Sequence, residues 1–183
     1  MMEPVVLIWP GGEHPFRLAL RELQVIQEKT DFGPEHLLHR INLAQWAAAD
    51  LFEILRNGLI GGGMPHVEAL KACRKAFEDH PLISFKVPAQ AVLAACLYGP
   101  PDDQPGRACR WRIRHRTTKN GRWKFSIYYG NGAVMGFTPA QIGQMTPWEY
   151  ACCFDGWQKA HGGADRGAGK PMSLERLREL GIE

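Results

Sequence analysis

The residue types here that could support metal or nucleophilic chemistry are histidines and cysteines. His36-Leu-Leu-His39 places two histidines three residues apart beside Glu35, whereas zinc proteases use His-Glu-x-x-His, with the histidines four apart. The five cysteines, an odd and irregularly spaced set, contain no Cys-x-x-Cys pair (Cys73, Cys96, Cys109, Cys152 and Cys153). This pattern argues against a zinc finger and a disulfide framework. We expect a solvated helix face at the histidines and reduced, mostly buried thiols.

Two glycine-rich stretches are weak candidates for nucleotide sites. Residues 125–136 read as a strand followed by Gly-x-Gly-x-x-x-Gly, but no parallel βαβ repeat follows. Residues 58–63 lack the Gly-Lys-Ser/Thr ending of a phosphate loop and are more typical of a helix end. No serine or cysteine has the context of a nucleophile elbow. The sequence therefore predicts no enzyme, no cofactor and no metal.

A basic segment with interleaved aromatic residues is the remaining chemical feature. Residues 104–148 hold eight basic residues and no acidic ones, including Arg110, Arg112, Arg114, Arg116, Arg122 and Lys124. Together with Trp111, Trp123 and neighbouring aromatics, this composition can follow phosphates and stack bases. Two other interpretations stay open: a solvated strand face whose aromatics enter a core, and a docking surface for an acidic protein.

Charge and turn residues divide the 183-residue chain into two predicted units. Residues 1–103 hold nine basic and thirteen acidic residues, so the basic excess begins near residues 99–106, Gly-Pro-Pro-Asp-Asp-Gln-Pro-Gly. This turn-rich stretch cannot continue a helix. We predict a front unit (residues 1–98), a linker (99–106), a second unit (107–161) and a flexible tail (162–183), with a possible short helix over 172–182.

The predicted fold class is α+β and mostly α. Val5–Trp9 and His14–Leu20 flank a tight turn and predict an N-terminal hairpin. Four to five short helices follow: one from Arg21, one from Pro34, one capped by Asn42 that bears Trp46, Leu51 and Leu55, one from Pro65 with Val67 inward, and one near 87–98.

The second unit is predicted to combine a basic hairpin over 107–129 with short helices. The strand after Lys119-Asn-Gly-Arg122 is ambiguous, because residues 124–135 also fit helical spacing. Thr138-Pro-Ala-Gln141 and Thr146-Pro-Trp-Glu149 each predict a helix start, with a threonine cap and proline at the first helical position. Tyr150, Phe154 and Trp157 share one face of the helix that follows.

These motifs carry a resemblance to phage tail proteins. The hairpin (residues 5–20), the helix Arg-Glu-Leu-Gln-Val-Ile-Gln-Glu28 and the run Leu55-Arg-Asn-Gly-Leu-Ile-Gly-Gly-Gly63 resemble the small tail-assembly protein of gene transfer agents and related prophages. The stretch Gly132–Trp157 resembles the short tail-assembly chaperones of the same viruses. The presence of both modules on one chain resembles a fused long form of the chaperone. Whether such a chain arises as an in-frame fusion or by frameshifting stays open.

The resemblance implies a non-catalytic tail-assembly chaperone. Such a protein binds the tape-measure protein, recruits tail-tube subunits and is absent from the finished particle. The expected partner-binding residues are Trp148, Tyr150, Phe154, Trp157, Leu51 and Leu55, and self-association is possible. No apolar run is long enough to span a membrane, and the N-terminus carries an acidic residue where a signal peptide has basic ones. We therefore expect a cytoplasmic protein. The alternative is a nucleic-acid-binding module that uses residues 107–129.

Overall fold

The fold is α+β and mostly helical, as predicted. The structure is a computed structural model, and it describes residues 3–100 and 119–161. None of the helices in these two ranges is long and apolar enough to cross a membrane. In chain order the elements are β1 (Val5–Trp9), β2 (Gly12–Phe16), α1 (Leu20–Thr30), α2 (Pro34–Asn42), α3 (Ala48–Gly61), α4 (His66–Asp79), η1 (Leu82–Phe85), α5 (Lys86–Tyr98), η3 (Lys119–Gly121), α6 (Phe125–Val134), α7 (Pro139–Gln144) and α8 (Pro147–Ala160).

The predicted N-terminal hairpin is confirmed, with a shift in its second strand. β1 and β2 pair antiparallel, and Trp9 lies opposite Gly12 across a turn made by Pro10 and Gly11. The second strand therefore begins two residues before the predicted His14, and it ends at Phe16 because the chain turns into α1 at Leu20. The inward face is anchored by Trp9 and Phe16, whose rings meet edge to face at 5.8 Å.

The four to five helices predicted for the front unit are present as α1 to α5, but three local expectations were wrong. Trp46 is not on the third helix, because α3 begins at Ala48. Asn42 does not cap α3; it is the last residue of α2. The start of α3 is set instead by Asp50, whose carboxylate accepts a hydrogen bond from the Ala47 N–H at 2.9 Å. Val67 was expected to point inward on α4, yet it is exposed, because Ala69, Cys73 and Ala76 form the buried face of that helix.

The ambiguous stretch after the Asn-Gly turn is a helix. Asn120 and Gly121 both have positive φ, 68° and 63°, as an Asn-Gly turn requires. The next residues do not form the second strand of a basic hairpin; α6 begins at Phe125. Phe125 and Tyr128 are three residues apart and turn one face into the core, where the Tyr128 ring stacks on Trp123 at 5.4 Å. The first predicted strand of that hairpin lies outside the described residues.

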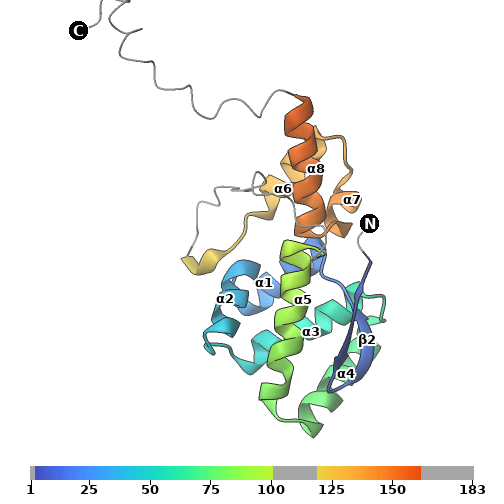
Figure 1. The fold of residues 1–183 in the computed structure, drawn as a ribbon, viewed down its shortest axis with the longest axis vertical. Coiled ribbons are helices and arrows are strands. Elements are labelled where there is room, and N and C mark those ends of the chain that lie inside the picture. Colours follow the sequence, from blue (N-terminus) through green and yellow to red (C-terminus); the bar gives the residue numbers. More distant parts are fainter. Residues whose placement is uncertain (1–2, 101–118, 162–183) are drawn as a thin grey trace, which may run out of the picture.

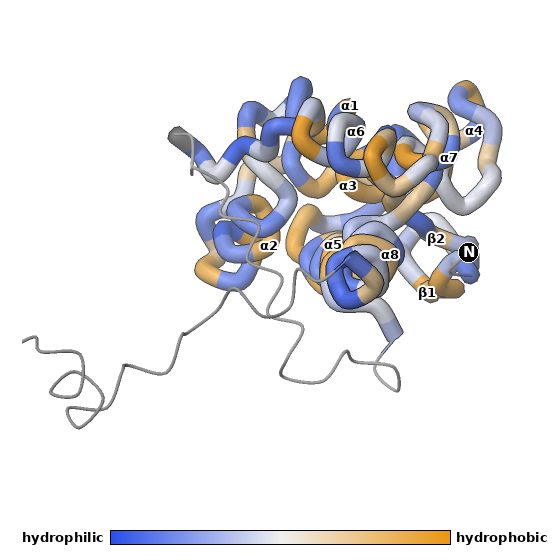
Figure 2. The backbone as a smooth tube through the Cα atoms, turned by 90° about the horizontal axis from the view of Figure 1, so that it is seen from above, coloured by the Kyte–Doolittle hydropathy of each residue, from blue (hydrophilic) through white to orange (hydrophobic). Residues whose placement is uncertain are grey.

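A single hydrophobic core joins the two predicted units. It contains the buried residues of α1 to α5 together with Trp123, Phe125, Tyr128, Ile142 and Tyr150. In Figure 1, α8 continues above α5 along the long axis, with α6 and α7 beside it. Figure 2 looks along that axis, and α5 and α8 overlap there. The second unit therefore packs on the end of the front unit and shares its interior.

Candidate docking groove

The two Thr-Pro starts form the caps that the sequence predicts. In α7 the Gln141 N–H donates to the Thr138 hydroxyl at 3.3 Å, and the Thr138 N–H donates back to the Gln141 side chain at 2.9 Å. In α8 the Glu149 N–H donates to Thr146 at 3.2 Å, and the Thr146 N–H donates to the Glu149 carboxylate at 2.7 Å. These reciprocal bonds satisfy amide groups that a helix start otherwise leaves open. They fix where both helices begin.

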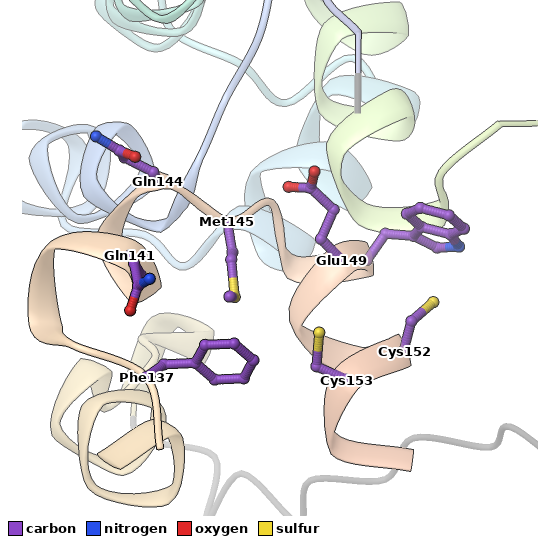
Figure 3. Close-up of a pocket in the computed structure, with 8 residues that line it drawn as sticks. Phe137, Gln141, Gln144, Met145, Glu149, Cys152 and Cys153 are labelled. Carbon is purple, nitrogen blue, oxygen red and sulfur yellow. The ribbon is translucent and has the colours of Figure 1, made fainter. Parts of the chain in front are cut away.

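An open, mostly apolar groove of about 390 Å³ lies between α7 and α8. Figure 3 shows the side chains of Phe137, Met145 and Cys153 turned toward the same space from opposite sides of the groove. The polar members lie at its edges. The groove is lined by Phe137, Gln141, Gln144, Met145, Trp148, Glu149, Cys152 and Cys153.

The wall of the groove is fixed to the front unit by polar contacts. The Arg17 guanidinium donates to the Glu149 carboxylate at 2.9 Å and to the Gln144 carbonyl at 2.7 Å. Both side chains of the Arg17–Glu149 pair are largely shielded from solvent, at 10% and 13% exposure, so the interaction is less screened than a surface ion pair. The Leu20 N–H also donates to the Met145 carbonyl at 2.8 Å. These contacts attach the junction between α7 and α8 to the start of α1 and to Arg17 just before it.

Trp148, an expected partner-binding residue, lines the groove and also closes the joint between α5 and α8. Gly99 has φ +73°, and a Cβ there would lie 2.5 Å from three atoms of the indole. Only a glycine lets the end of α5 approach the ring so closely. The predicted linker thus begins as part of the packed interface, and residues 101–106 lie outside the described part of the chain.

The other aromatic residues of α8 have different surroundings. Tyr150 is fully buried, and its hydroxyl donates to the Tyr128 carbonyl at 3.1 Å. Burial also raises the pKa of Tyr150 to about 12, so its hydroxyl stays protonated and available as a donor. Phe154 is half-buried and stacks on Tyr150, while Trp157 stacks on His161 with centroids 4.4 Å apart. Tyr150 is therefore a core residue, and Phe154 and Trp157 retain partly exposed surface on α8.

Leu51 and Leu55 do not contribute to any surface. Both have 0% exposure and lie inside the shared core on the inner face of α3. Their apolar spacing predicted helix packing correctly, but it could not distinguish a packed face from a docking face. In this conformation they cannot contact a partner.

Of the six predicted basic contact residues, two lie in the described ranges. Arg122 is 40% exposed and forms an ion pair with Asp31, which also accepts a hydrogen bond from Asn120 at 3.1 Å. Lys124 is exposed at the start of α6. Arg110, Arg112, Arg114 and Arg116 lie outside the described residues. The Arg122–Asp31 pair thus places the turn against the end of α1.

The histidines and cysteines show no metal chemistry in the described ranges. His36 stacks on Phe32 at 5.3 Å, and no group of three histidine, cysteine or acidic side chains there could hold a metal ion. Cys73 and Cys96 are buried, and burial raises the pKa of Cys73 to about 12. Burial likewise raises the pKa of Cys153, whereas Cys152 is exposed at the groove. Of the described thiols, Cys152 is the one most accessible to solvent.

Of the eight residues that line the groove, the predicted partner-binding set contained only Trp148. For two of the residues that were missed, the capping motifs contained a signal. Phe137 and Met145 are the residues immediately before the caps Thr138 and Thr146. A hydrophobic residue at that position often packs against the helix that it precedes. The two capping motifs therefore set two helices and also place one apolar side chain on each side of the groove.

Comparison with known proteins identifies the front part of the chain. The model of the family described as "Phage tail tube protein, GTA-gp10" matches residues 4–99. This range includes the hairpin and α1 to α5, and it ends at Gly99, where the chain meets Trp148. No match was found among the curated proteins or among the solved structures.

Proposed function

Since this chain belongs to the phage tail tube protein family GTA-gp10, we propose that it acts in phage tail morphogenesis as a non-catalytic assembly chaperone. The groove between α7 and α8 binds an amphipathic helix of the tape-measure protein. The same molecule then brings tail-tube subunits to that helix. It works in the cytoplasm of the host and leaves before the particle is complete.

The observation that carries this proposal is the groove itself. Its volume, about 390 Å³, lies within the range of roughly 300–1,000 Å³ that is usual for binding pockets. Apolar side chains from both sides, with polar groups at the edges, suit the apolar stripe of a helix laid into a groove. A long helical protein with such stripes aggregates unless they are covered.

The position of the groove supports a link between two partners. Its residues, 137–153, lie outside the family match, but Arg17 and Leu20 hold them on the matched part. A helix bound there is therefore fixed relative to the tail-family body. Joining two binding surfaces on one rigid molecule raises the effective concentration of each partner for the other.

The proposal is tested by co-expression with the tape-measure protein and by binding of its helical peptides. Met145→Asp places a charge on the wall of the groove and is expected to weaken peptide binding at least tenfold, about 1.4 kcal/mol. Val134→Asp is the matched control, because Val134 is 68% exposed on α6 and does not line the groove. The proposal fails if the tape-measure protein stays insoluble, or if both variants bind the peptide as the native chain does.

A second candidate function is a structural subunit of the tail tube, and the family description favours it. A tube subunit remains in the particle in many copies, whereas an assembly chaperone does not. Quantitative immunoblotting of purified particles separates the two: absence supports the chaperone, and a stoichiometry similar to that of the major tail protein supports the tube subunit.

A further inference from the structure

We propose that two copies of this chain associate through β1, whose outer edge pairs with the same edge of a second copy in antiparallel register about Leu7. This surface shares no residue with the lining of the groove between α7 and α8, so it is independent of the proposed function. Three observations carry the pairing: the register of the hairpin, the exposure of β1 and the positions of its flanking prolines.

The hairpin register shows which backbone groups of β1 face away from β2. Val6 lies opposite Pro15, which has no N–H, so these two residues cannot exchange the two hydrogen bonds of a bonded pair. The bonded pairs are therefore those on either side, such as Leu7 with His14. Because bonding alternates along an antiparallel strand, the N–H and C=O groups of Val6 and Ile8 point away from β2.

The edge formed by Val6 and Ile8 is open to solvent. Over the whole residue, backbone included, Ile8 is 82% exposed and Val6 is 58% exposed. In the described part of the chain β1 has β2 as its one neighbouring strand, and Figures 1 and 2 show the hairpin at the margin of the molecule. The far edge of β2 is covered by the end of α3, since a Cβ at Gly62 would lie 2.0 Å from the Pro15 carbonyl oxygen. The hairpin therefore offers β1 as its open edge.

The sequence of β1 fits a second copy of itself. Pairing about Leu7 places Val6 opposite Ile8 of the second copy, and both have outward backbone groups. This pair exchanges two hydrogen bonds, and its symmetric equivalent exchanges two more. In the same register Pro4 faces Pro10 of the second copy, so the two residues without an N–H oppose each other. A shift by two residues places a proline opposite Val6 or Ile8 and removes hydrogen bonds.

The side chains of β1 suit the same pairing. β1 has no charged residue, whereas strand edges that stay unpaired are usually protected by charged side chains. Val6 and Ile8 project on the outer face and form two cross-strand pairs of β-branched side chains, which fit a pleated surface well. On the inner face Leu7, partly buried in the single copy, lies directly opposite itself. The pairing extends a two-stranded sheet, which is marginal by itself, to four strands.

The contact is small and closed, so we expect a reversible dimer. The five residues of β1 on each copy are fewer than the about 20–30 residues that each side of a stable complex contributes. Association stops at two copies, because both β1 edges are then paired and both β2 edges are covered. The dimer carries two grooves between α7 and α8, so a partner with repeated helical segments can bind both at raised effective concentration.

Sedimentation equilibrium of the full chain, up to about 1 mM, tests the association. Val6→Lys with Ile8→Lys places lysines opposite each other across the pair and is expected to weaken self-association at least ~100-fold. Both side chains are exposed, so the variant keeps its fold, which circular dichroism checks. The matched control is Val67→Lys with Val87→Lys, which adds the same charge at residues 63% and 69% exposed on α4 and α5. The control is expected to associate as the native chain does.

Cysteine cross-linking tests the register. Directly opposed residues of a non-hydrogen-bonded pair have Cα atoms about 4.5 Å apart, a separation that a disulfide accepts. Under mild oxidation Leu7→Cys is therefore expected to form a disulfide with residue 7 of the second copy, identified by tandem mass spectrometry. Val5→Cys is the matched control, since Val5 is half-buried on the same face. It lies opposite Trp9 of the second copy, so the two residues 5 are about 13 Å apart and do not cross-link.

Three outcomes overturn the inference. A native chain that stays monomeric over the whole concentration range does not pair through β1; if the lysine variant then loses binding to a tail protein, a strand of that protein is the occupant instead. A lysine variant that associates as strongly as the native chain places the contact elsewhere. Absence of the cross-link in Leu7→Cys, or equal cross-linking in Val5→Cys, contradicts the register.

The proposed function fails or holds separately from the dimer. A lysine variant that is monomeric and still binds tape-measure peptide supports both proposals. A native chain that dimerises through β1 but binds no peptide retains the dimer and refutes the proposed function alone.

Discussion

The contact between Gln27 and Trp123 provides the sharpest test of how the second unit is attached. The Gln27 amide donates to the Trp123 carbonyl at 2.9 Å, and its oxygen accepts the Trp123 N–H at 2.6 Å. Gln27 is 5% exposed and Trp123 is 3% exposed. One side chain of α1 thus pairs with both backbone groups of a residue 96 positions later. We predict that Gln27→Met loosens α6 from the front unit.

The expected loss of stability follows from the Trp123 N–H and carbonyl, two buried backbone groups whose hydrogen bonds to Gln27 the substitution removes. A buried polar group without its partner costs about 1–3 kcal/mol, and the methionine keeps a similar volume, so cavity formation adds little. We expect a loss of about 3 kcal/mol in the free energy of unfolding. In a chain of this size, that corresponds to a fall in Tm of about 6–12 °C.

The assay is urea and thermal unfolding followed by circular dichroism, with Gln24→Met as the matched control. Gln24 lies on the same helix, but its amide donates only to the exposed Glu28 carboxylate, at 3.2 Å. The control is expected to change stability by less than about 0.5 kcal/mol. If Gln27→Met and Gln24→Met are equally stable, the reasoning about the buried pair is wrong.

Gln27→Glu adds a pH dependence to the same test. An introduced carboxylate could accept the Trp123 N–H but would face the Trp123 carbonyl, to which only the protonated acid can donate. Burial and this carbonyl raise the folded-state pKa of the introduced group above its unfolded value of about 4.3. The folded state then holds its proton more tightly, so stability relative to the native chain is greatest below about pH 4.3 and falls as the pH rises. A stability difference that is independent of pH would contradict the proposed pairing.

Four further predictions concern the joint, the caps, the core and the basic segment. Gly99→Ala should lower the free energy of unfolding by about 2 kcal/mol, because alanine disfavours a positive φ and its Cβ meets the Trp148 ring; chemical unfolding measures this. Thr146→Ala, at a buried cap, should cost about 1 kcal/mol and exceed the cost of Thr138→Ala at an exposed one. Leu51→Ala should cost about 2–5 kcal/mol, and binding of tape-measure peptide to the remaining folded protein should be unchanged. Replacing the four arginines Arg110, Arg112, Arg114 and Arg116 by Ser should leave peptide binding unchanged; loss of a strongly salt-dependent retention of DNA or RNA would instead support the nucleic-acid alternative.

The helix starts and the hairpin were predictable because their causes are local. A threonine, a proline and an acid or amide within four residues determine the caps at Thr138 and Thr146, wherever the helices then pack. The turn at Pro10 and Gly11 and the alternation of β1 likewise depend on near neighbours. The apolar spacing of Leu51 and Leu55 belongs to the same class, since it identifies a helix and its apolar side.

Tertiary structure decided what those elements contact. Local pattern allowed residues 124–135 to be strand or helix, and the helix prevails where Phe125 and Tyr128 join Trp123 in the shared core. Leu51 became interior and Met145, between α7 and α8, became a wall of the groove, although both are apolar residues. The difference arises from contacts between distant residues, such as Arg17 with Glu149. Such contacts depend on the meeting of two folded surfaces, which no short stretch of sequence encodes by itself.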